Sequence, residues 1–117
     1  MSDLQAMDTP WGRWEVLLDA DYCKVKRIIV KPGARLSYQR HQKREELWTI
    51  VQGVATVTID DVVSDYAVGE IVHIPLKSAH RVANTQDKVL VFIEIQRGTY
   101  FGEDDIERLS DDYGRAV

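Results

Sequence analysis

Short runs of apolar and β-branched residues, separated by turn residues, follow one another along most of the chain. Residues 54–59 alternate between apolar and other side chains from Ala55 onward. This period of two is typical of strands with one buried face. Glycine, proline, aspartate or asparagine follows nearly every run, which marks the ends of the expected strands. The strands that this pattern predicts are residues 14–18, 24–30, 46–52, 54–59, 71–74, 81–83 and 89–96.

Turn signals at this spacing favour an all-β sandwich or barrel. The pair Asp60-Asp61 directly after residues 54–59 indicates a hairpin. No stretch before residue 103 has the apolar spacing of a helix. Residues 103–109, in which acids come first, are expected to form a short C-terminal helical turn. Because 117 residues is an ordinary domain length, we expect residues 1–117 to form a single domain.

Two expected strands carry carboxylates on the face that should be buried. Residues two apart in a strand share a face, so Glu46 points the same way as Trp48 and Ile50. By the same rule, Glu94 shares its face with Phe92. A buried carboxylate is costly unless it is paired or bound to a metal ion, so both glutamates need a partner.

The charge distribution excludes several classes of protein. The net charge of −4 comes from residues 99–117, where Arg108 and Arg115 are outnumbered by acids. A nucleic-acid-binding protein would need a basic surface, which is absent. Cys23 is the single cysteine and cannot form an intramolecular disulfide. The longest apolar run, 89–93, is too short for a membrane span, and the N-terminus lacks the apolar core of a signal peptide. We therefore expect a cytoplasmic protein without nucleic-acid or membrane partners.

Four polar side chains have a spacing that suits a metal site. Gln39 and His41 are two residues apart and point side by side, Glu46 comes from the next strand, and His80 follows the turn at Pro75. Nitrogen and oxygen ligands of this kind suit several divalent ions. We expect one ion, with Zn²⁺ preferred and Mn²⁺, Fe²⁺, Co²⁺ or Ni²⁺ as alternatives. The competing interpretation is a buried polar network without metal.

The segments that carry these residues, 33–53 and 69–84, resemble the two motifs of the cupin superfamily, which are antiparallel β-barrels of the jelly-roll type. The first motif usually has histidine at both ends of a His-x-His triplet, and Gln39 stands at the first of these two positions. Gln39-x-His41, Arg44-x-Glu46 and Trp48 are similar to the cupin domain of type II mannose-6-phosphate isomerases. That domain often forms the C-terminal part of a bifunctional mannose-1-phosphate guanylyltransferase. The closing segment, 98–115, also resembles this family.

The sequence departs from the family pattern near the expected ligands. Gln42 and Lys43 replace a run of histidines, and Leu47 lies where a histidine usually separates the glutamate from the tryptophan. Leu76-Lys77 occupies the turn after Pro75, where the family has a glycine. None of these changes affects the four expected metal ligands.

The resemblance implies a metal-dependent sugar-phosphate isomerase that interconverts mannose 6-phosphate and fructose 6-phosphate through an enediolate. Glu94 is the expected catalytic base, since burial would raise its pKa to a useful value. The alternative role for Glu94 is an ion pair with Lys26. Two other functions stay open. One is an isomerase or epimerase of another phosphorylated or nucleotide sugar, and the other is a non-catalytic cupin that binds sugar or metal.

Binding of a sugar phosphate requires cationic side chains. Arg44 is the first expected substrate contact because it shares the face of Glu46, and a solvated charge at the rim is its alternative. Lys26, Arg108 and Arg115 are further candidates, although the two C-terminal arginines can instead pair with nearby acids. Ser37 is a further substrate-binding candidate because Ser37-x-Gln39-x-His41 resembles the zinc-binding motif of type I mannose-6-phosphate isomerases.

The remaining features receive structural interpretations. His73 and Trp48 are expected to be structural, and Cys23 is expected to be inert. Residues 99–117 are expected to form an ordered lid or brace, so truncation after Gly98 should reduce stability or activity.

We expect a homodimer formed through sheet edges, with the segment around Trp11 and Trp14 packed across or exchanged.

Overall fold

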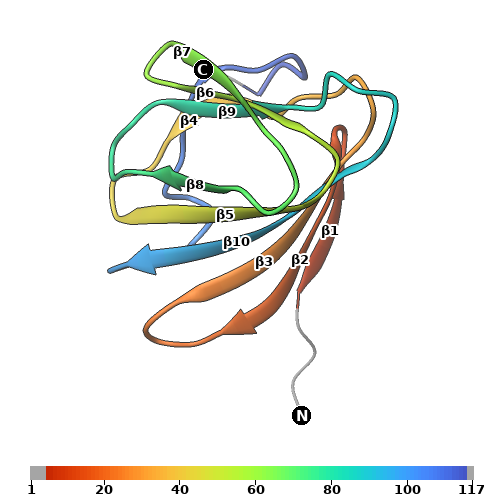
Figure 1. Ribbon diagram of the computed structural model, residues 1–117. Coiled ribbons are helices and arrows are strands. Elements are labelled where there is room, and N and C mark those ends of the chain that lie inside the picture. Colours follow the sequence, from red (N-terminus) through yellow and green to blue (C-terminus); the bar gives the residue numbers. More distant parts are fainter. Residues whose placement is uncertain (1–4, 116–117) are drawn as a thin grey trace.

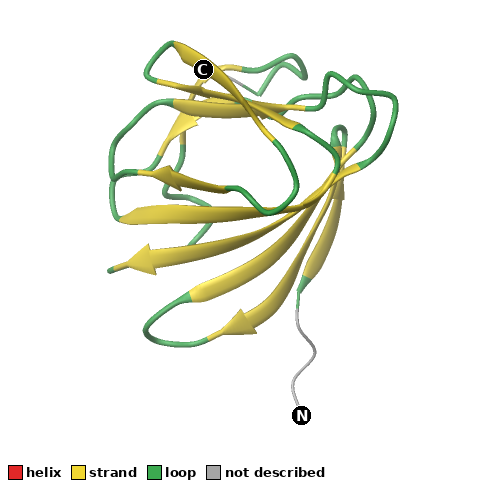
Figure 2. Cartoon of the chain, in the orientation of Figure 1, coloured by secondary structure: helices red, strands yellow, loops and turns green. Residues whose placement is uncertain are grey.

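Two antiparallel β-sheets enclose a common interior in a computed structural model that describes residues 5–115 (Figures 1 and 2). The six-stranded sheet has the order β1 (Ala6–Thr9), β2 (Gly12–Asp19), β3 (Lys24–Val30), β10 (Leu90–Gly98), β5 (Arg44–Gln52) and β8 (Ile71–Ile74). The five-stranded sheet has the order β11 (Glu107–Ser110), β4 (Tyr38–Arg40), β9 (His80–Ala83), β6 (Ala55–Ile59) and β7 (Val62–Tyr66). The predicted all-β, antiparallel fold is confirmed.

The apolar half of the interior is built from alternating residues of both sheets. Ile50 and Phe92 point inward from β5 and β10, and Val57 and Val82 come from β6 and β9. Each such side chain is almost fully buried, and burial of one stabilises the fold by about 1.5–3 kcal/mol. These contacts hold the two sheets together.

The other half of the interior is polar. Along β5 and β10 the same inward face continues with Glu46 and Glu94, and β3 adds Lys26. The strand register pairs Glu94 with Lys26 on one side and with Trp48 on the other. The three central strands of the larger sheet therefore bring charged side chains together at one end of the interior.

Every predicted strand is present, and β3 and β8 have the expected bounds. Asp60 and Asp61 form the expected hairpin turn between β6 and β7, with φ of 47° and 70°. Positive φ at two successive residues is the signature of the tight hairpin turns that match strand twist. The strands without a predicted range are β1, β4, β7 and β11.

The predicted C-terminal helical turn is wrong. Residues 5–115 contain no helix, and therefore none that could span a membrane. Residues 107–110 instead form β11, which pairs with β4 and places Arg108 opposite Gln39. An ion pair of 3.0 Å between Arg40 and Glu107 joins the same two strands. Pairing with β4 extends the backbone hydrogen bonding of the smaller sheet, which outweighs the weak local helical preference.

Candidate functional site

A cavity of about 290 Å³ opens at the polar end of the interior. Trp14, Trp48 and Phe92 form part of its wall, and the rest is largely polar. The predicted site residues that line this cavity are Lys26, Ser37, Gln39, His41, Arg44, Glu46, Glu94, Arg108 and Arg115. Residues of both sheets and of the C-terminal segment, all predicted from the sequence, therefore meet in one place.

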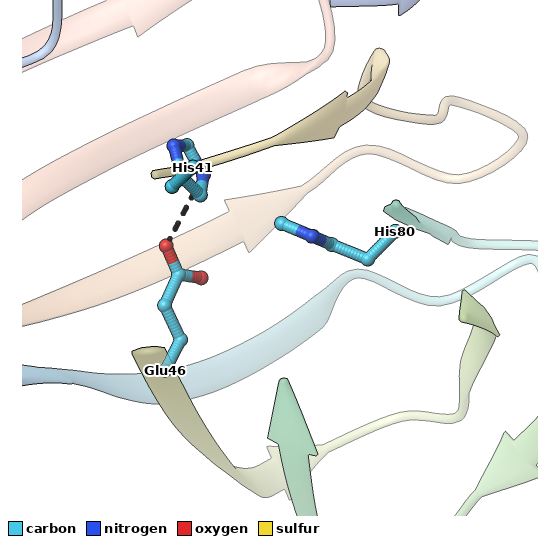
Figure 3. Close-up of side chains that lie close together, drawn as sticks. All are labelled: His41, Glu46 and His80. Carbon is cyan, nitrogen blue, oxygen red and sulfur yellow. Dashed lines mark ion pairs between the residues drawn. The ribbon is translucent and has the colours of Figure 1, made fainter. Parts of the chain in front are cut away.

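His41, Glu46 and His80 form the candidate metal cluster. One ligand atom from each residue lies within 4.8 Å of the others, and all three residues are buried. Figure 3 shows the side chains pointing toward a common space, with the His41–Glu46 pair marked. They come from the chain just after β4, from β5 and from β9, so the cluster joins the two sheets. Gln39 lies directly opposite His80 across β4 and β9, and its role as a ligand stays a prediction.

Both histidines are held in the orientation that a metal ligand needs. The Nδ1–H group of His41 donates to the carbonyl oxygen of Asp105 at 2.6 Å, and that of His80 donates to Ser78 at 3.1 Å. Each Nε2 is then left with a lone pair, and that of His41 accepts a hydrogen bond from Arg44 Nη2 at 3.3 Å. His80 Nε2 is buried and has no hydrogen-bond partner within residues 5–115. An orphaned imidazole nitrogen in this position fits a divalent ion.

The protonation states of His41 and Glu46 also suit a metal ion. Burial lowers the pKa of His41, with a further lowering by Arg44, so its imidazole is neutral near pH 7. Burial alone would raise the pKa of Glu46. The Arg44 guanidinium and the neighbouring histidines outweigh this effect and hold the pKa below its ordinary value. A neutral imidazole and an ionised carboxylate are the forms that bind metal.

Two side chains fix the position of the Glu46 carboxylate. Trp48 Nε1 donates to one oxygen at 3.0 Å, and Arg44 Nε donates to the other at 2.9 Å. Trp48 is buried in the core as expected, and its indole N–H also orients the expected metal ligand. Arg44 is buried, so the alternative of a solvated rim charge is wrong.

Glu94 lies beside this cluster and carries a proton more readily than an ordinary glutamate. Burial, followed by the negative charge of Glu46, raises the pKa of Glu94 to about 8. Gln96 donates to its carboxyl group at 2.8 Å. The alternative ion pair with Lys26 does not form, because the Lys26 ammonium instead contacts Glu103 at 2.9 Å. Glu94 is thus a proton-carrying group within the cavity.

The C-terminal arginines differ in their surroundings. Arg115 is paired with Asp111 by two side-chain hydrogen bonds of 2.7 and 3.1 Å, which is the alternative considered for it. Arg108 lines the cavity, and its Nε has no hydrogen-bond partner in the described part of the chain. Ser37 is buried in the cavity wall. Arg108 therefore has more capacity to bind a ligand than Arg115.

Sequence reasoning did not single out two acids of the C-terminal segment. Glu103 lines the cavity and contacts Lys26 and Arg44. Asp105 accepts hydrogen bonds from the backbone of Gln42 and Lys43 at 3.1 and 3.0 Å. These contacts support the expected brace over residues 99–115, and residues 116–117 lie outside the described residues. The acidic run itself gives no signal of which acid contacts which partner.

His73 and Cys23 lie outside the cavity lining. The His73 side chain is exposed and lies 3.6 Å from Glu45 on the outer face of the larger sheet. Cys23 is partly buried. Neither residue contributes to the candidate site.

Comparison with protein families finds one match over most of the chain. The family described as "Mannose-6-phosphate isomerase C-terminal" matches residues 3–111. The alginate biosynthesis protein AlgA of Pseudomonas aeruginosa is 48% identical over 108 residues, which is 92% of this chain and 22% of that protein. Mannose-1-phosphate guanylyltransferase of Escherichia coli is 42% identical over 106 residues, with coverage of 91% and 22%. The chain thus spans about a fifth of the length of these relatives.

Solved structures share the fold at low sequence identity. The capsular polysaccharide assembling protein CapF of Staphylococcus aureus has a TM-score of 0.78 and 23% identity, covering 94% of this chain and 32% of that one. Oxalate decarboxylase of Bacillus subtilis has a TM-score of 0.79 and 18% identity, with coverage of 92% and 30%. The Cnp3 cupin domain of Schizosaccharomyces pombe has a TM-score of 0.71 and 12% identity, with coverage of 83% and 69%. These likenesses establish the cupin fold and carry no information on activity.

Proposed function

The chain belongs to the mannose-6-phosphate isomerase C-terminal family, and on that premise we propose that it interconverts mannose 6-phosphate and fructose 6-phosphate with the aid of one divalent ion. The observation that carries the proposal is the cluster of His41, Glu46 and His80, with its orphaned His80 nitrogen. His41 and Glu46 of this cluster line the same cavity as the protonatable Glu94. We treat residues 1–117 as a single cupin domain.

Gln39, His41, Glu46 and His80 would hold the ion. Zn²⁺ is preferred because imidazole and carboxylate ligands suit it, with Mn²⁺, Fe²⁺, Co²⁺ and Ni²⁺ as alternatives. A bound divalent ion supplies an electrophile that stabilises negative charge on the substrate oxygens. Asp105 and Ser78 support the two histidines from behind through their carbonyl oxygens.

Glu94 is the proposed catalytic base. Isomerisation requires removal of the proton at C2 and its return to C1, and one carboxyl group can perform both steps. A group whose pKa lies near the working pH exchanges protons most effectively, and burial raises the pKa of Glu94 from its ordinary value toward that range. The hydrogen bond from Gln96 fixes the position of the Glu94 carboxyl group.

Cationic and polar side chains of the same cavity would bind the rest of the substrate. Lys26, Arg44 and Arg108 are the proposed contacts for the phosphate, and Ser37 is a proposed contact for a sugar hydroxyl. Arg115 is a weaker candidate because Asp111 already neutralises it. Trp14 and Trp48 give the cavity apolar surfaces against which a sugar ring can pack.

The direct test is conversion of mannose 6-phosphate by the purified chain with added Zn²⁺, Mn²⁺ or Co²⁺. The expected result is formation of fructose 6-phosphate in at least one of these conditions. Absence of turnover with every metal would overturn the isomerase proposal. Binding of the sugar phosphate without turnover would support the alternative of a non-catalytic binding module.

A panel of substrates separates the leading proposal from an enzyme of another sugar. Glucose 6-phosphate and a nucleotide sugar are offered beside mannose 6-phosphate under the same conditions. Faster conversion of either one would transfer the proposal to that substrate while leaving the metal site unchanged. A cytoplasmic location and assembly as a homodimer complete the proposal.

A further inference from the structure

Two buried cations converge on a single carboxylate oxygen in the cavity. Lys26 Nζ lies 2.9 Å from Glu103 Oε2, and Arg44 Nη1 lies 3.5 Å from the same atom. The Lys26 ammonium also lies 4.4 Å from the centroid of the Trp14 ring. The two cations come from β3 and β5, whereas Glu103 comes from the C-terminal loop.

The burial of the three groups is unequal. The side chains of Lys26 and Arg44 are 3% and 6% exposed, but that of Glu103 is 50% exposed. The cations are therefore fixed in the wall of the cavity, and the acid that neutralises them lies at its opening. Glu103 can leave without opening the hydrophobic core, while the two cations cannot.

Glu103 uses only part of the hydrogen-bonding capacity of these cations. Arg44 Nη1 forms no hydrogen bond within residues 5–115. The Lys26 ammonium has three donors, and one side-chain hydrogen bond is formed, to Glu103. A phosphate group offers three oxygens and about two negative charges, so it would satisfy these donors better than one carboxylate.

We propose that Lys26 and Arg44 form an anion subsite for the phosphate of the ligand, and that Glu103 is the resident carboxylate that this phosphate displaces. The assignment of the anion as a sugar phosphate rests on the proposed function. The inference extends that function by giving Glu103 a role in selectivity. An uncharged sugar cannot replace the Glu103 carboxylate, whereas a phosphorylated sugar can.

The test measures binding of inorganic phosphate to the full chain after removal of divalent ions, so that phosphate cannot bind a metal. Isothermal titration compares the wild type with Glu103→Gln, Lys26→Met and Glu107→Gln. Glu107 is the matched control, because it is an acid of the same segment that pairs with Arg40 away from the cavity lining.

Glu103→Gln is expected to bind phosphate about tenfold more tightly, because a competing negative charge is lost. Lys26→Met is expected to bind it about tenfold more weakly, and Glu107→Gln is expected to match the wild type. Equal or weaker phosphate binding by Glu103→Gln would overturn the proposal. Thermal unfolding of each variant checks that it is folded.

A second measurement uses only the wild-type chain. Addition of phosphate is expected to accelerate amide hydrogen exchange in residues 102–105, because displacement of Glu103 releases this loop from Lys26. Unchanged exchange at saturating phosphate would also overturn the proposal. Neither measurement requires turnover, so a failed isomerase assay and a failed subsite proposal give different results.

Discussion

Glu46 and Glu94 are neighbouring buried carboxyl groups with different protonation. Arg44 and two histidines surround Glu46 and lower its pKa, whereas burial and the charge of Glu46 raise the pKa of Glu94 to about 8. Carboxyl groups whose surroundings separate their pKa values in this way commonly take different chemical roles. This separation supports Glu46 as a ligand and Glu94 as a proton carrier.

Replacement of Glu94 by glutamine tests the role of this residue in proton transfer. The variant keeps the size of the side chain but has no ionisable group, so kcat should fall by at least about 100-fold. Its metal content, measured by elemental analysis, should equal that of the wild type. Glu45→Gln is the matched control, because Glu45 lies next to Glu46 on β5 but pairs with Arg97 away from the cavity lining. An unchanged kcat in Glu94→Gln would remove Glu94 from the mechanism.

The raised pKa of Glu94 also predicts how the stability of the metal-free protein depends on pH. Between about pH 6.5 and 8, the folded state holds a proton on Glu94 that the unfolded state has released. The free energy of unfolding should therefore fall with rising pH, by at most about 1.4 kcal/mol per pH unit. The lowered pKa of His41 acts at lower pH, where it makes stability rise with pH.

Urea unfolding at several pH values between 6.5 and 8 measures this slope. In Glu94→Gln the fall should be absent, since glutamine does not titrate. A wild-type stability that is constant or rises over this range would contradict the assigned protonation of Glu94.

The alternation of faces accounts for which site residues could be predicted. Glu46 and Glu94 share strand faces with apolar neighbours, so the sequence alone placed both of them inside. The contacts of Glu103 were not predictable, because Lys26 lies 77 residues away and no local pattern relates the two. Contacts between loops and strands depend on the tertiary fold rather than on local periodicity.

At the scale of elements, the segment between β10 and β11 supports the cluster of His41, Glu46 and His80 from outside. Asp105 makes the main contact of this segment. Its carbonyl oxygen accepts a hydrogen bond from His41 Nδ1–H, and its carboxylate accepts two hydrogen bonds from backbone N–H groups. Through these three hydrogen bonds, the C-terminal segment fixes the chain between β4 and β5. The orientation of His41 therefore depends on residues far along the sequence.

Asp105→Ala tests this support. Loss of the two carboxylate contacts should loosen the loop and lower the affinity for Zn²⁺ by about 10–100-fold, the range found when groups that orient metal ligands are removed. Asp104→Ala is the control, because the Asp104 side chain contacts Tyr100 on the surface. Competition with a chelating dye measures both affinities. Equal Zn²⁺ affinities in the two variants would show that Asp105 does not position His41.

The four strands without a predicted range, β1, β4, β7 and β11, escaped prediction for a common reason. β1 and β7 lie at sheet edges and are mostly exposed, so they show no alternation of buried and exposed residues. β4 has three residues, all of them half-buried. β11 is mostly exposed and forms by pairing with β4, which the acidic sequence around it does not encode. Periodicity identifies strands that have a buried face and misses those that lack one.

At the scale of the whole molecule, the homodimer stays a prediction. Trp11 and Trp14 are buried in the core of their own chain. β1, which pairs with β2, is an edge strand of the larger sheet. Met7 on this strand is 48% exposed. An open edge with an exposed apolar side chain can pair with a second copy of the chain.

Light scattering coupled to size-exclusion chromatography measures the assembly. A mass of twice that of the chain is expected, and Met7→Lys should lower the dimer fraction by placing a charge on the edge. Thr9→Ser serves as a control substitution on the same strand. A monomer at every concentration would contradict the homodimer.

The proposed isomerisation depends on an ion held by His41, Glu46 and His80. Titration of chelator-treated protein with Zn²⁺, with simultaneous measurement of fructose 6-phosphate formation from mannose 6-phosphate, tests this dependence. We expect no turnover without metal and a rise that saturates at one ion per chain, and we expect His80→Ala to show no such rise. Full turnover by the metal-free protein, or none at full occupancy with Zn²⁺ or with Mn²⁺ or Co²⁺ in its place, would contradict it.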